Sequence, residues 1–600
     1  MAQSKVSVRL YPSGSGVVLI GMDWTPPKGD PFFGFAIRRT PGFHEPIPFR
    51  GKPVQSNFSW LENRLSFNGK PDVFTPSNIA PIQKFQWWDA RFHPQEDAGK
   101  KFTYEVMPMA GQPDALVPVS GAAGSASLTF PARDTAGVGI WFNRPFVSSQ
   151  AFARLLQRLR VDPEDPSTLT DRAKAQIYAW LGNDLEKAVP QFVSASKGAG
   201  LAGAIYHLTD STTIAALTER SGSMVLHWKN PTAKGAGDTT DKKAEVRLKK
   251  ANWQTVHRQS GNLMHNKILV ENKGKKPGRL LMGSANFTLE AYTTQANVLH
   301  VWKNPALSAG YRDRVEKLIG DPTPASLSKS ARWSAPIPLG GGADLKVFFS
   351  PESDQSKKTP TWSPASIKPI VDAIKSAKSS IVFCLYDPTD EDLLNAVLDA
   401  ITKNRAAFGL LNTLPGSAPK PTTKAGKKTP NYAIKKRLYE FTNDHNEIVS
   451  AQGYLSPLTG LPQGWLAELN ALPSAKKQTA GSFDFSTIHV HHKFVLIDGE
   501  TNHPILFTGS ANLSKNSSTR NDENTLWITG HTPLAQTYLA EFMRLFEHYR
   551  SRPTKRAGRG KDMAGKTTRP PLRLDATGQK WWPKYFKPSP SATARRSFGT

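Results

Sequence analysis

The stretch HVHHKFVLIDGE, from His489 to Glu500, places three histidines and a lysine directly before a run of apolar residues that is typical of a buried strand. Side chains two residues apart in a strand share a face and lie about 7 Å apart along it. His491 and Lys493 therefore point the same way, which sets a group that titrates near neutrality beside a positive charge. Asp498 lies an odd number of residues after Lys493 and faces away, so we expect it to support the site rather than react.

The same pattern occurs earlier in the chain, and three segments of the two copies match in the same order. The matched segments are AIYHLTDSTTIAAL from Ala204 with CLYDPTDEDLLNAVL from Cys384, HNKILVEN from His265 with HHKFVLID from His491, and GSANFT from Gly283 with GSANLS from Gly509. Three ordered matches indicate two copies of one α/β unit, in which a strand leads through Thr-Asp into a helix. In the first copy, His265 and Lys267 share a strand face.

Each copy continues with Gly-Ser-Ala-Asn, at residues 283–286 and 509–512. Glycine allows the backbone to approach a ligand closely, and serine and asparagine supply neutral hydrogen-bond donors. Two such sets, related by a pseudo-two-fold axis, would surround a phosphoryl group and place one imidazole on either side of it, as in-line displacement requires. One imidazole would attack phosphorus while the other protonates the leaving oxygen and later activates water. The two lysines would supply the charge that Mg²⁺ often supplies, so we expect no metal and no cofactor.

The doubled pattern resembles the phospholipase D superfamily, whose signature is His-x-Lys-x4-Asp followed by Gly-Ser-x-Asn and whose fold is two α/β lobes that meet at one active site. The resemblance covers roughly residues 140 to 550. It implies two catalytic half-sites, which are His265, Lys267, Ser284 and Asn286, and His491, Lys493, Ser510 and Asn512. The aspartate of the motif is Asp498 in the second copy, but Asn272, beside Glu271, takes its place in the first. The tyrosyl-DNA phosphodiesterase branch of the superfamily also lacks that aspartate.

The resemblance further implies a nucleophile in the first copy and a steadying carboxylate downstream of the second. Glu523 lies 32 residues after His491, whereas the residue 32 after His265 is Asn297, with Gln295 nearby. A carboxylate makes an imidazole more basic, whereas an amide only orients it. We therefore expect His265, supported by Glu523, to be the nucleophile. His491, backed by Gln295 or Asn297, would be the acid and then the base, although the reverse assignment stays open.

The regions outside the repeat predict one further domain and a tail. Short strand patterns between turn signals run from Lys5 to about Phe130 and are typical of a β-sandwich. The region is similar to a fibronectin type III module, with Trp24 and Tyr104 as core aromatics. We thus predict an α/β protein with a β-sandwich domain at residues 1–135, two pseudo-symmetric phospholipase D-like lobes of mixed sheets flanked by helices at 140–335 and 340–550, and a basic, largely disordered tail at 551–600. Within the tail, KWWPKYFKPSP either docks onto the fold or contacts bases or a membrane interface.

Charge indicates an anionic partner. Lysine and arginine number 77 against 49 acidic residues, a net charge of +28. Both copies also carry a basic insertion before the histidine motif, which predicts either a flexible solvated loop or a rim that gathers anions. The single Cys384 excludes an intramolecular disulfide and a cysteine-based zinc site. Neither a signal peptide nor a run of ~18 apolar residues is present, so we expect a cytoplasmic protein. Export without a signal would leave no trace in the sequence.

Three functions fit these observations. The first is a metal-independent phosphodiester hydrolase with a phosphohistidine intermediate, which cleaves phospholipid headgroups in the manner of phospholipase D. It would act at a peripheral membrane surface. Because both half-sites lie in one chain, we expect the monomer to be active. The second is a nuclease or DNA-end phosphodiesterase, which the basic charge favours. The third is a non-catalytic phosphate-binding scaffold, which the two intact His-Lys pairs disfavour. We expect the first.

Overall fold

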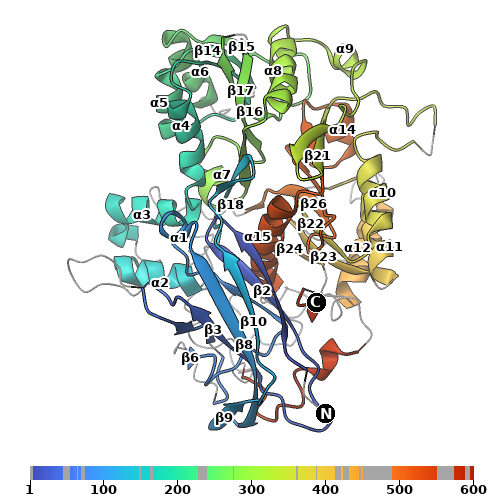
Figure 1. Cartoon of the computed structure of the whole chain (residues 1–600). Coiled ribbons are helices and arrows are strands. Elements are labelled where there is room, and N and C mark those ends of the chain that lie inside the picture. Colours follow the sequence, from blue (N-terminus) through green and yellow to red (C-terminus); the bar gives the residue numbers. More distant parts are fainter. Residues whose placement is uncertain are drawn as a thin grey trace.

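The computed structural model of the chain (Figure 1) describes residues 4–600 apart from 45–54, 64, 69–74, 147–149, 163–165, 228–239, 275, 360–361, 387, 404, 413–419, 423–431, 445–447, 451–488, 551–572, 588–594 and 597. Two large mixed sheets form the centre of the described fold, and smaller antiparallel sheets precede them in sequence. Helices flank the mixed sheets (Figure 1). The predicted α/β class is confirmed.

The two large sheets have eight strands each, and the strands follow the same order. In lobe 1 the order is β11 (Asp134–Thr135), β12 (Val138–Phe142), β19 (Val298–Trp302), β17 (Lys276–Gly283), β16 (Lys267–Lys273), β13 (Gly200–Tyr206), β14 (Gly222–His227) and β15 (Gln254–His257). In lobe 2 it is β20 (Ile337–Gly340), β21 (Ala343–Phe349), β28 (Asn524–Thr529), β27 (Ile505–Gly509), β26 (Lys493–Ile497), β22 (Ser380–Leu385), β23 (Ala406–Leu411) and β24 (Ile448–Ser450). Each sheet is parallel among its last three strands and antiparallel elsewhere. This match confirms that the chain contains two copies of one unit.

Helices connect the parallel strands, because parallel pairing needs a crossover. The matching crossover helices are α5 (Ser211–Thr218) and α6 (Thr240–Lys250) in lobe 1, and α11 (Glu391–Thr402) and α12 (Tyr432–Asp444) in lobe 2. The aspartate of each repeated Thr-Asp pair caps the helix that follows it. Asp210 accepts the N–H of Thr213 at 2.7 Å, and Asp390 accepts that of Leu393 at 3.0 Å. The Thr-Asp pair therefore marks a helix start in both copies.

Other described elements complete the lobes and link them. The remaining longer helices are α2 (Gln150–Leu159), α3 (Asp171–Gly182), α4 (Leu185–Ala195), α8 (Pro305–Ile319) and α10 (Lys368–Ser376), and the short ones include α7 (Leu289–Thr293), α9 (Pro324–Ser328) and α14 (Lys515–Thr519). Between the lobes, β18 (Gln295–Ala296) pairs in parallel with β25 (His489–Val490). Among the described helices, none is both long and apolar enough to cross a membrane.

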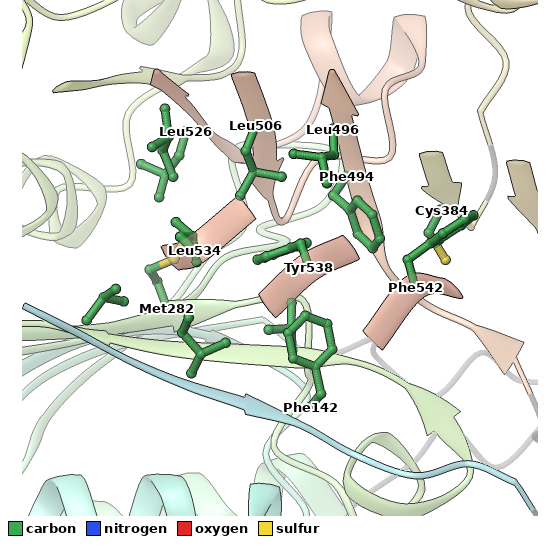
Figure 2. Close-up of a cluster of buried hydrophobic side chains, with 14 of the residues drawn as sticks. Phe142, Met282, Cys384, Phe494, Leu496, Leu506, Leu526, Leu534, Tyr538 and Phe542 are labelled. Carbon is green, nitrogen blue, oxygen red and sulfur yellow. The ribbon is translucent and has the colours of Figure 1, made fainter. Parts of the chain in front are cut away.

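The helix α15 (Thr532–Arg550) runs between the two large sheets and joins their cores. Figure 2 shows Leu534, Tyr538 and Phe542 of this helix beside Phe142 of lobe 1 and Phe494 of lobe 2. The ring of Tyr538 meets that of Phe142 edge-on at 5.1 Å and that of Phe494 at 4.9 Å between centroids. Burial of such side chains contributes roughly 1.5–3 kcal/mol each. The helix thereby fixes how the two sheets, and the motifs on them, sit relative to one another.

The N-terminal region consists of small antiparallel sheets around a shared core. One sheet contains β1 (Ser7–Ser13), β2 (Val17–Asp23) and β7 (Gln86–Asp89), and the other contains β10 (Gly124–Thr129), β8 (Lys101–Gln112), β3 (Gly34–Thr40), β4 (Ser59–Trp60) and β9 (Ala115–Pro118). Ile20 of the first sheet and Phe35 of the second belong to one buried cluster, together with Trp24 and Tyr104. Trp24 and Tyr104 are core residues, as predicted. The sandwich of fibronectin type III type stays a prediction.

Residues near the end of the chain pack onto the N-terminal sheets. Trp581 and Tyr585, each 6% exposed, lie in the same buried cluster, and Nε1 of Trp581 donates to the carbonyl of Phe32 at 2.6 Å. Phe598 is fully buried against Tyr11, with ring centroids 6.4 Å apart. The described part of KWWPKYF is therefore docked onto the fold. Residues 551–572, where the predicted disordered tail begins, lie outside the described residues.

Candidate active site

The two histidine motifs lie where the lobes meet, and each is tied to the other lobe through its backbone. His265 donates its backbone N–H to the carbonyl of Asp522 at 2.9 Å, and His491 donates its own to the carbonyl of Ala296 at 3.0 Å. These matching contacts relate the half-sites by a pseudo-two-fold axis. The two imidazole rings face each other with centroids 6.3 Å apart. At this separation one phosphoryl group can lie within reach of both rings.

The ring of His265 is held by a carboxylate from the other lobe. Its Nδ1 lies 2.9 Å from Oε2 of Glu523, and Glu523 is fully buried. Because a carboxylate only accepts hydrogen bonds, Nδ1 carries the proton and Nε2 is left unprotonated in the neutral ring. An unprotonated Nε2 is the atom that can attack phosphorus.

The ring of His491 is held in the same way by an amide. Its Nδ1 lies 2.9 Å from Oδ1 of Asn297. The amide nitrogen of Asn297 donates to the carbonyls of Ala291 at 2.9 Å and Gln295 at 3.3 Å, which fixes the amide oxygen toward His491. Of the two candidates from the sequence, Asn297 contacts the histidine. The half-sites thus share one geometry but differ in charge at the residue behind the imidazole.

The serines lie behind the imidazoles rather than beside the gap between them. Ser284 donates its hydroxyl hydrogen to Oδ1 of Asn297 at 2.9 Å, and Ser510 donates to Oε2 of Glu523 at 2.7 Å. Ser517 also donates to Glu523, at 3.1 Å. The sequence suggested that Ser284 and Ser510 donate to the phosphoryl group. The structure instead commits their hydroxyls to the residues that orient the histidines.

The glycine of each Gly-Ser-x-Asn motif lies against the backbone of a neighbouring strand. A Cβ added at Gly283 would lie 2.2 Å from the carbonyl oxygen of Val298, and one added at Gly509 would lie 2.3 Å from that of Asn524. The asparagines of the motif come next. The buried Oδ1 atoms of Asn286 and Asn512 have no hydrogen-bond partner among the described residues. Each of these oxygens can accept a hydrogen bond from a ligand, because a buried polar group without a partner is costly.

Each lysine is buried beside its histidine and under a tyrosine ring. Nζ of Lys267 donates to the carbonyl of His265, and Nζ of Lys493 to that of His491, both at 2.6 Å. An ammonium group has three donors, so each lysine can also bind an anion. Nζ of Lys267 lies 5.0 Å from the ring centroid of Tyr206, and that of Lys493 lies 5.1 Å from the ring centroid of Tyr386.

The two tyrosines were not predicted as site residues, although they lie at the same position of the repeat. Tyr206 is the last residue of β13 and Tyr386 directly follows β22, at matching positions of AIYHLTD and CLYDPTD. Tyr206 lies 5.1 Å from the ring of His265, and Tyr386 lies 5.0 Å from that of His491, between centroids. Their shared place in the aligned segments was the signal that could have identified them.

Unlike Asn297, the other residues expected to support the site have partners other than the two imidazoles. Asp498 accepts the backbone N–H groups of Ser379 at 2.7 Å and Ser380 at 3.0 Å, at the start of β22. Asn272 pairs with Gly200 at the far end of β16. Gln295 contributes its carbonyl to Asn297. Among the other histidines, His492 is buried near Phe142 and Phe494.

Burial disfavours the charged forms of His265, Lys267 and His491. It lowers the pKa of His265 to about 4, against the opposing effect of Glu523, and lowers the pKa of Lys267 to about 7. Burial and the charge of Lys493 hold the pKa of His491 well below its usual value. Burial acts to raise the pKa of Glu523, but His265 and Lys267 outweigh it and keep that carboxyl below its usual range. His265 is therefore neutral near pH 7, in the form that attacks.

Within the described residues, most basic side chains of the two insertions lie on helices. Before His265 the insertion contains α6, whose exposed positions include Lys242, Lys243, Arg247, Lys249 and Lys250. The first turn of α6 reaches the site, because Asp241 accepts from Nδ1 of His207 at 2.8 Å and His207 packs on Tyr206 with centroids 3.9 Å apart. The matching helix in lobe 2 is α12. A basic helix face thus begins beside the half-site that contains His265.

Comparison with known proteins gives one family match, in lobe 2. The profile of the family described as "Cardiolipin synthase, PLD-like domain" matches residues 370–546. The mitochondrial cardiolipin hydrolase of Xenopus laevis is 39% identical over 66 residues, which cover 11% of this chain and 29% of that protein. The match therefore spans less than a third of that relative.

Two solved structures can be aligned over more of the chain. Phosphatidylserine synthase of Haemophilus influenzae Rd KW20 is 12% identical, with a TM-score of 0.37, over 62% of this chain and 85% of that one. Yeast tyrosyl-DNA phosphodiesterase is 13% identical, with a TM-score of 0.29, over 56% of this chain and 84% of that one.

The family profile covers the second copy of a repeat whose first copy has the same strand order and the same pair of motifs. Lobe 2 is therefore a phospholipase D-like domain, and lobe 1 repeats its architecture.

Proposed function

We propose that the protein hydrolyses phosphodiesters through a phosphohistidine, without a metal ion, and that its substrates are phospholipids cleaved on the headgroup side. The observation that carries this proposal is the pair of facing imidazoles, 6.3 Å apart, with a carboxylate behind one and an amide behind the other. Two nitrogen bases on opposite sides of one gap suit in-line displacement at phosphorus. The catalytic residues of the proposal are His265, Lys267 and Asn286, with His491, Lys493 and Asn512.

In the first step, Nε2 of His265 attacks phosphorus and the bond to the leaving oxygen breaks. Glu523 stabilises the positive charge that develops on the ring of His265. The ring of His491 gives a proton to the leaving oxygen. His491 binds that proton only when the negative charge of the substrate lies beside it, because burial otherwise keeps the ring neutral.

In the second step, His491 takes a proton from water, and the water oxygen attacks phosphorus and releases His265. Asn297 keeps the ring of His491 oriented in both steps without increasing its basicity. The ammonium groups of Lys267 and Lys493 offset the charge on the phosphoryl oxygens, so no step needs a metal ion. Chelation of divalent metals should therefore leave turnover unchanged.

Lipid is the substrate class that we favour. The description of the matched family and the name of the Xenopus laevis relative both refer to cardiolipin, a phospholipid. The exposed cations of α6 beside the site suit an anionic lipid surface, where Lys and Arg bind headgroup phosphates. We further propose that one chain is active by itself, because both half-sites come from the same chain.

A nuclease or DNA-end phosphodiesterase is the second candidate. It is favoured by the net charge of +28 and by Asn272, which stands where the motif usually has aspartate. Phosphate contacts with Lys and Arg dominate affinity for nucleic acids. The same chemistry at His265 and His491 would serve either substrate.

A side-by-side assay separates these functions. Purified protein is offered phosphatidylcholine vesicles with and without cardiolipin, single-stranded DNA and double-stranded DNA, with the His265→Ala protein as control. We expect release of lipid headgroups by the unaltered protein and none by the variant. DNA cleavage with intact lipid would support the second candidate, and equal activity of the His265→Ala protein would contradict both.

A further inference from the structure

A buried cluster of ion pairs connects the lobes next to the carboxylate that holds His265. Asp522 immediately precedes Glu523 and is 1% exposed. Its carboxylate accepts from Nε of Arg258 at 2.8 Å and from Nη2 of Arg314 at 3.2 Å. Arg258 follows β15 and Arg314 lies on α8, so both arginines come from lobe 1. Arg258 also contacts Asp321 at 2.5 Å, and two positive charges therefore meet two negative ones.

The same cluster fixes the backbone around Glu523. The carbonyl of Asp522 accepts the N–H of His265, as described above, at 2.9 Å. Arg314 donates to the carbonyl of Ser350, and the N–H of Ser350 in turn donates to the carbonyl of Glu523 at 3.1 Å. The arginines thus contact the carboxylate of Asp522 directly and the carbonyl of Glu523 through Ser350. The side chain of Glu523, which lies between these two contacts, is the one that reaches His265.

The equivalent position of the other half-site carries alanine. The carbonyl of Ala296 accepts the N–H of His491, and Ala296 precedes Asn297 as Asp522 precedes Glu523. A methyl side chain cannot form an ion pair. Buried ion pairs add little net stability, because the loss of hydration offsets their attraction. Stability alone therefore does not explain why the ionic residues lie at the half-site with the carboxylate.

We propose that Arg258 and Arg314 are positioning residues, which act through Asp522 to hold Glu523 on Nδ1 of His265 and so make His265 the better nucleophile. The proposal rests on the proposed function. Asp522 and Glu523 are adjacent buried carboxylates, which repel each other. The two arginines draw the carboxylate of Asp522 toward lobe 1. The carboxylate of Glu523 then accepts hydrogen bonds from His265, Ser510 and Ser517.

The test separates attack by His265 from the later hydrolysis. Bis(4-nitrophenyl) phosphate has a leaving group that departs without a proton donor, so the first burst of nitrophenolate reports attack, and the slower phase that follows reports hydrolysis. Rapid mixing is compared for the unaltered protein, Arg258→Gln and Arg258→Lys. Arg312→Gln is the matched control, because Arg312 lies on α8 beside Arg314 but pairs with Asp313 and Glu316.

We expect the burst of Arg258→Gln to slow roughly ten-fold or more, as is typical when an outer hydrogen-bonding partner is lost. Hydrolysis should change much less, because it depends on His491. Arg258→Lys keeps the charge and should slow the burst less, and Arg312→Gln should change neither phase. If Arg258→Gln does not fold, Arg258→Lys and Arg314→Gln provide the same comparison.

Two results would overturn the inference. One is an unchanged burst in the folded variants. The other is an equal slowing of burst and hydrolysis with a lower melting temperature, which would indicate a structural role only. Absence of any nitrophenolate release from diesters by the unaltered protein would instead contradict the proposed function, so the two failures are distinguishable.

Discussion

At the scale of single residues, the two half-sites differ most in the group behind each imidazole. An oxygen lies 2.9 Å from Nδ1 of both histidines, but it belongs to the carboxylate of Glu523 at His265 and to the amide of Asn297 at His491. A carboxylate stabilises the imidazolium that forms on attack, and an amide does not. The choice of nucleophile should therefore follow the carboxylate.

Exchanging the two groups should exchange the two roles. Glu523→Gln should slow attack by roughly a hundred-fold or more, in the range of a lost acid–base contribution. The double variant Glu523→Gln with Asn297→Asp should recover part of this loss and should carry phosphorus on His491. The check is the rate of nitrophenolate release together with mass spectrometry of the trapped protein. A double variant no faster than Glu523→Gln, with phosphorus still on His265, would contradict the assignment.

The pH dependence of kcat/KM follows from two side chains that burial perturbs. The pKa of His265 is lowered to about 4, so the nucleophile is lost by protonation below that pH. The pKa of Lys267 is lowered to about 7, so its positive charge is lost as pH rises through that value. We expect a bell-shaped profile with its maximum on the acidic side of neutrality, measured with a soluble diester from about pH 3 to about pH 9.

Lys267→Arg is the control for the alkaline limb. Arginine stays charged throughout this range. If the variant is active, its kcat/KM should not fall as pH rises through about 7. An unaltered protein with full activity at about pH 9 would disagree with the role given to Lys267.

At the scale of helices and strands, local periodicity predicted much of the site. The period of two in a strand placed His491 and Lys493 together and turned Asp498 away, because this alternation needs only local sequence. The partners of the serines could not be predicted in this way. Ser284 and Ser510 bond to residues 13 positions further along the chain, and only the strand pairing brings those residues back. Sequence periodicity says nothing about such partners.

The exposed cations of α6 predict electrostatic binding to anionic vesicles. Each Lys or Arg near such a surface contributes about 1 kcal/mol, or about five-fold in affinity. Exchanging Lys242, Lys243 and Arg247 for Gln should therefore weaken binding to cardiolipin-containing vesicles by about a hundred-fold, measured by co-sedimentation. Lys375→Gln, in the last turn of α10, is the control. Undiminished binding by the triple variant would show that α6 does not contact the lipid surface.

At the scale of the whole molecule, one buried carboxylate joins three parts of the chain. Glu547 of α15 contacts Lys84 of the N-terminal region at 3.2 Å, Arg550 at 2.6 Å and Arg595 near the end of the chain at 3.3 Å. Burial acts to raise the pKa of Glu547, but these three cations outweigh it and hold that pKa well below its usual value. Its contribution to stability is therefore present above the pKa of the unfolded chain and is lost as pH falls.

Glu547→Gln should destabilise the protein by about 3–5 kcal/mol, because it leaves buried cations without a counter-charge. Thermal unfolding followed by circular dichroism measures the loss. Glu316→Gln removes an exposed partner of Arg312 and should change the free energy of unfolding by about 0.5 kcal/mol or less. Similar shifts in the two variants would show that Glu547 does not link the parts as described.

The arrangement of the whole molecule was the least predictable from the sequence. The doubled motif predicted two lobes around one site, because each copy supplies half of the chemistry. The docking of the aromatic segment at Trp581 onto the N-terminal sheets was left open, since its lysines and prolines suit either an exposed or a packed segment. Long-range packing of this kind depends on complementary surfaces that no local pattern records.

The measurement that tests the account most directly is the identity of the residue that carries phosphorus during turnover. The unaltered protein is mixed with a phosphodiester, quenched at alkaline pH to preserve phosphohistidine, digested and examined by mass spectrometry. We predict a phosphorus adduct on His265. An adduct on His491, or product formed with no adduct on either histidine, would contradict the account.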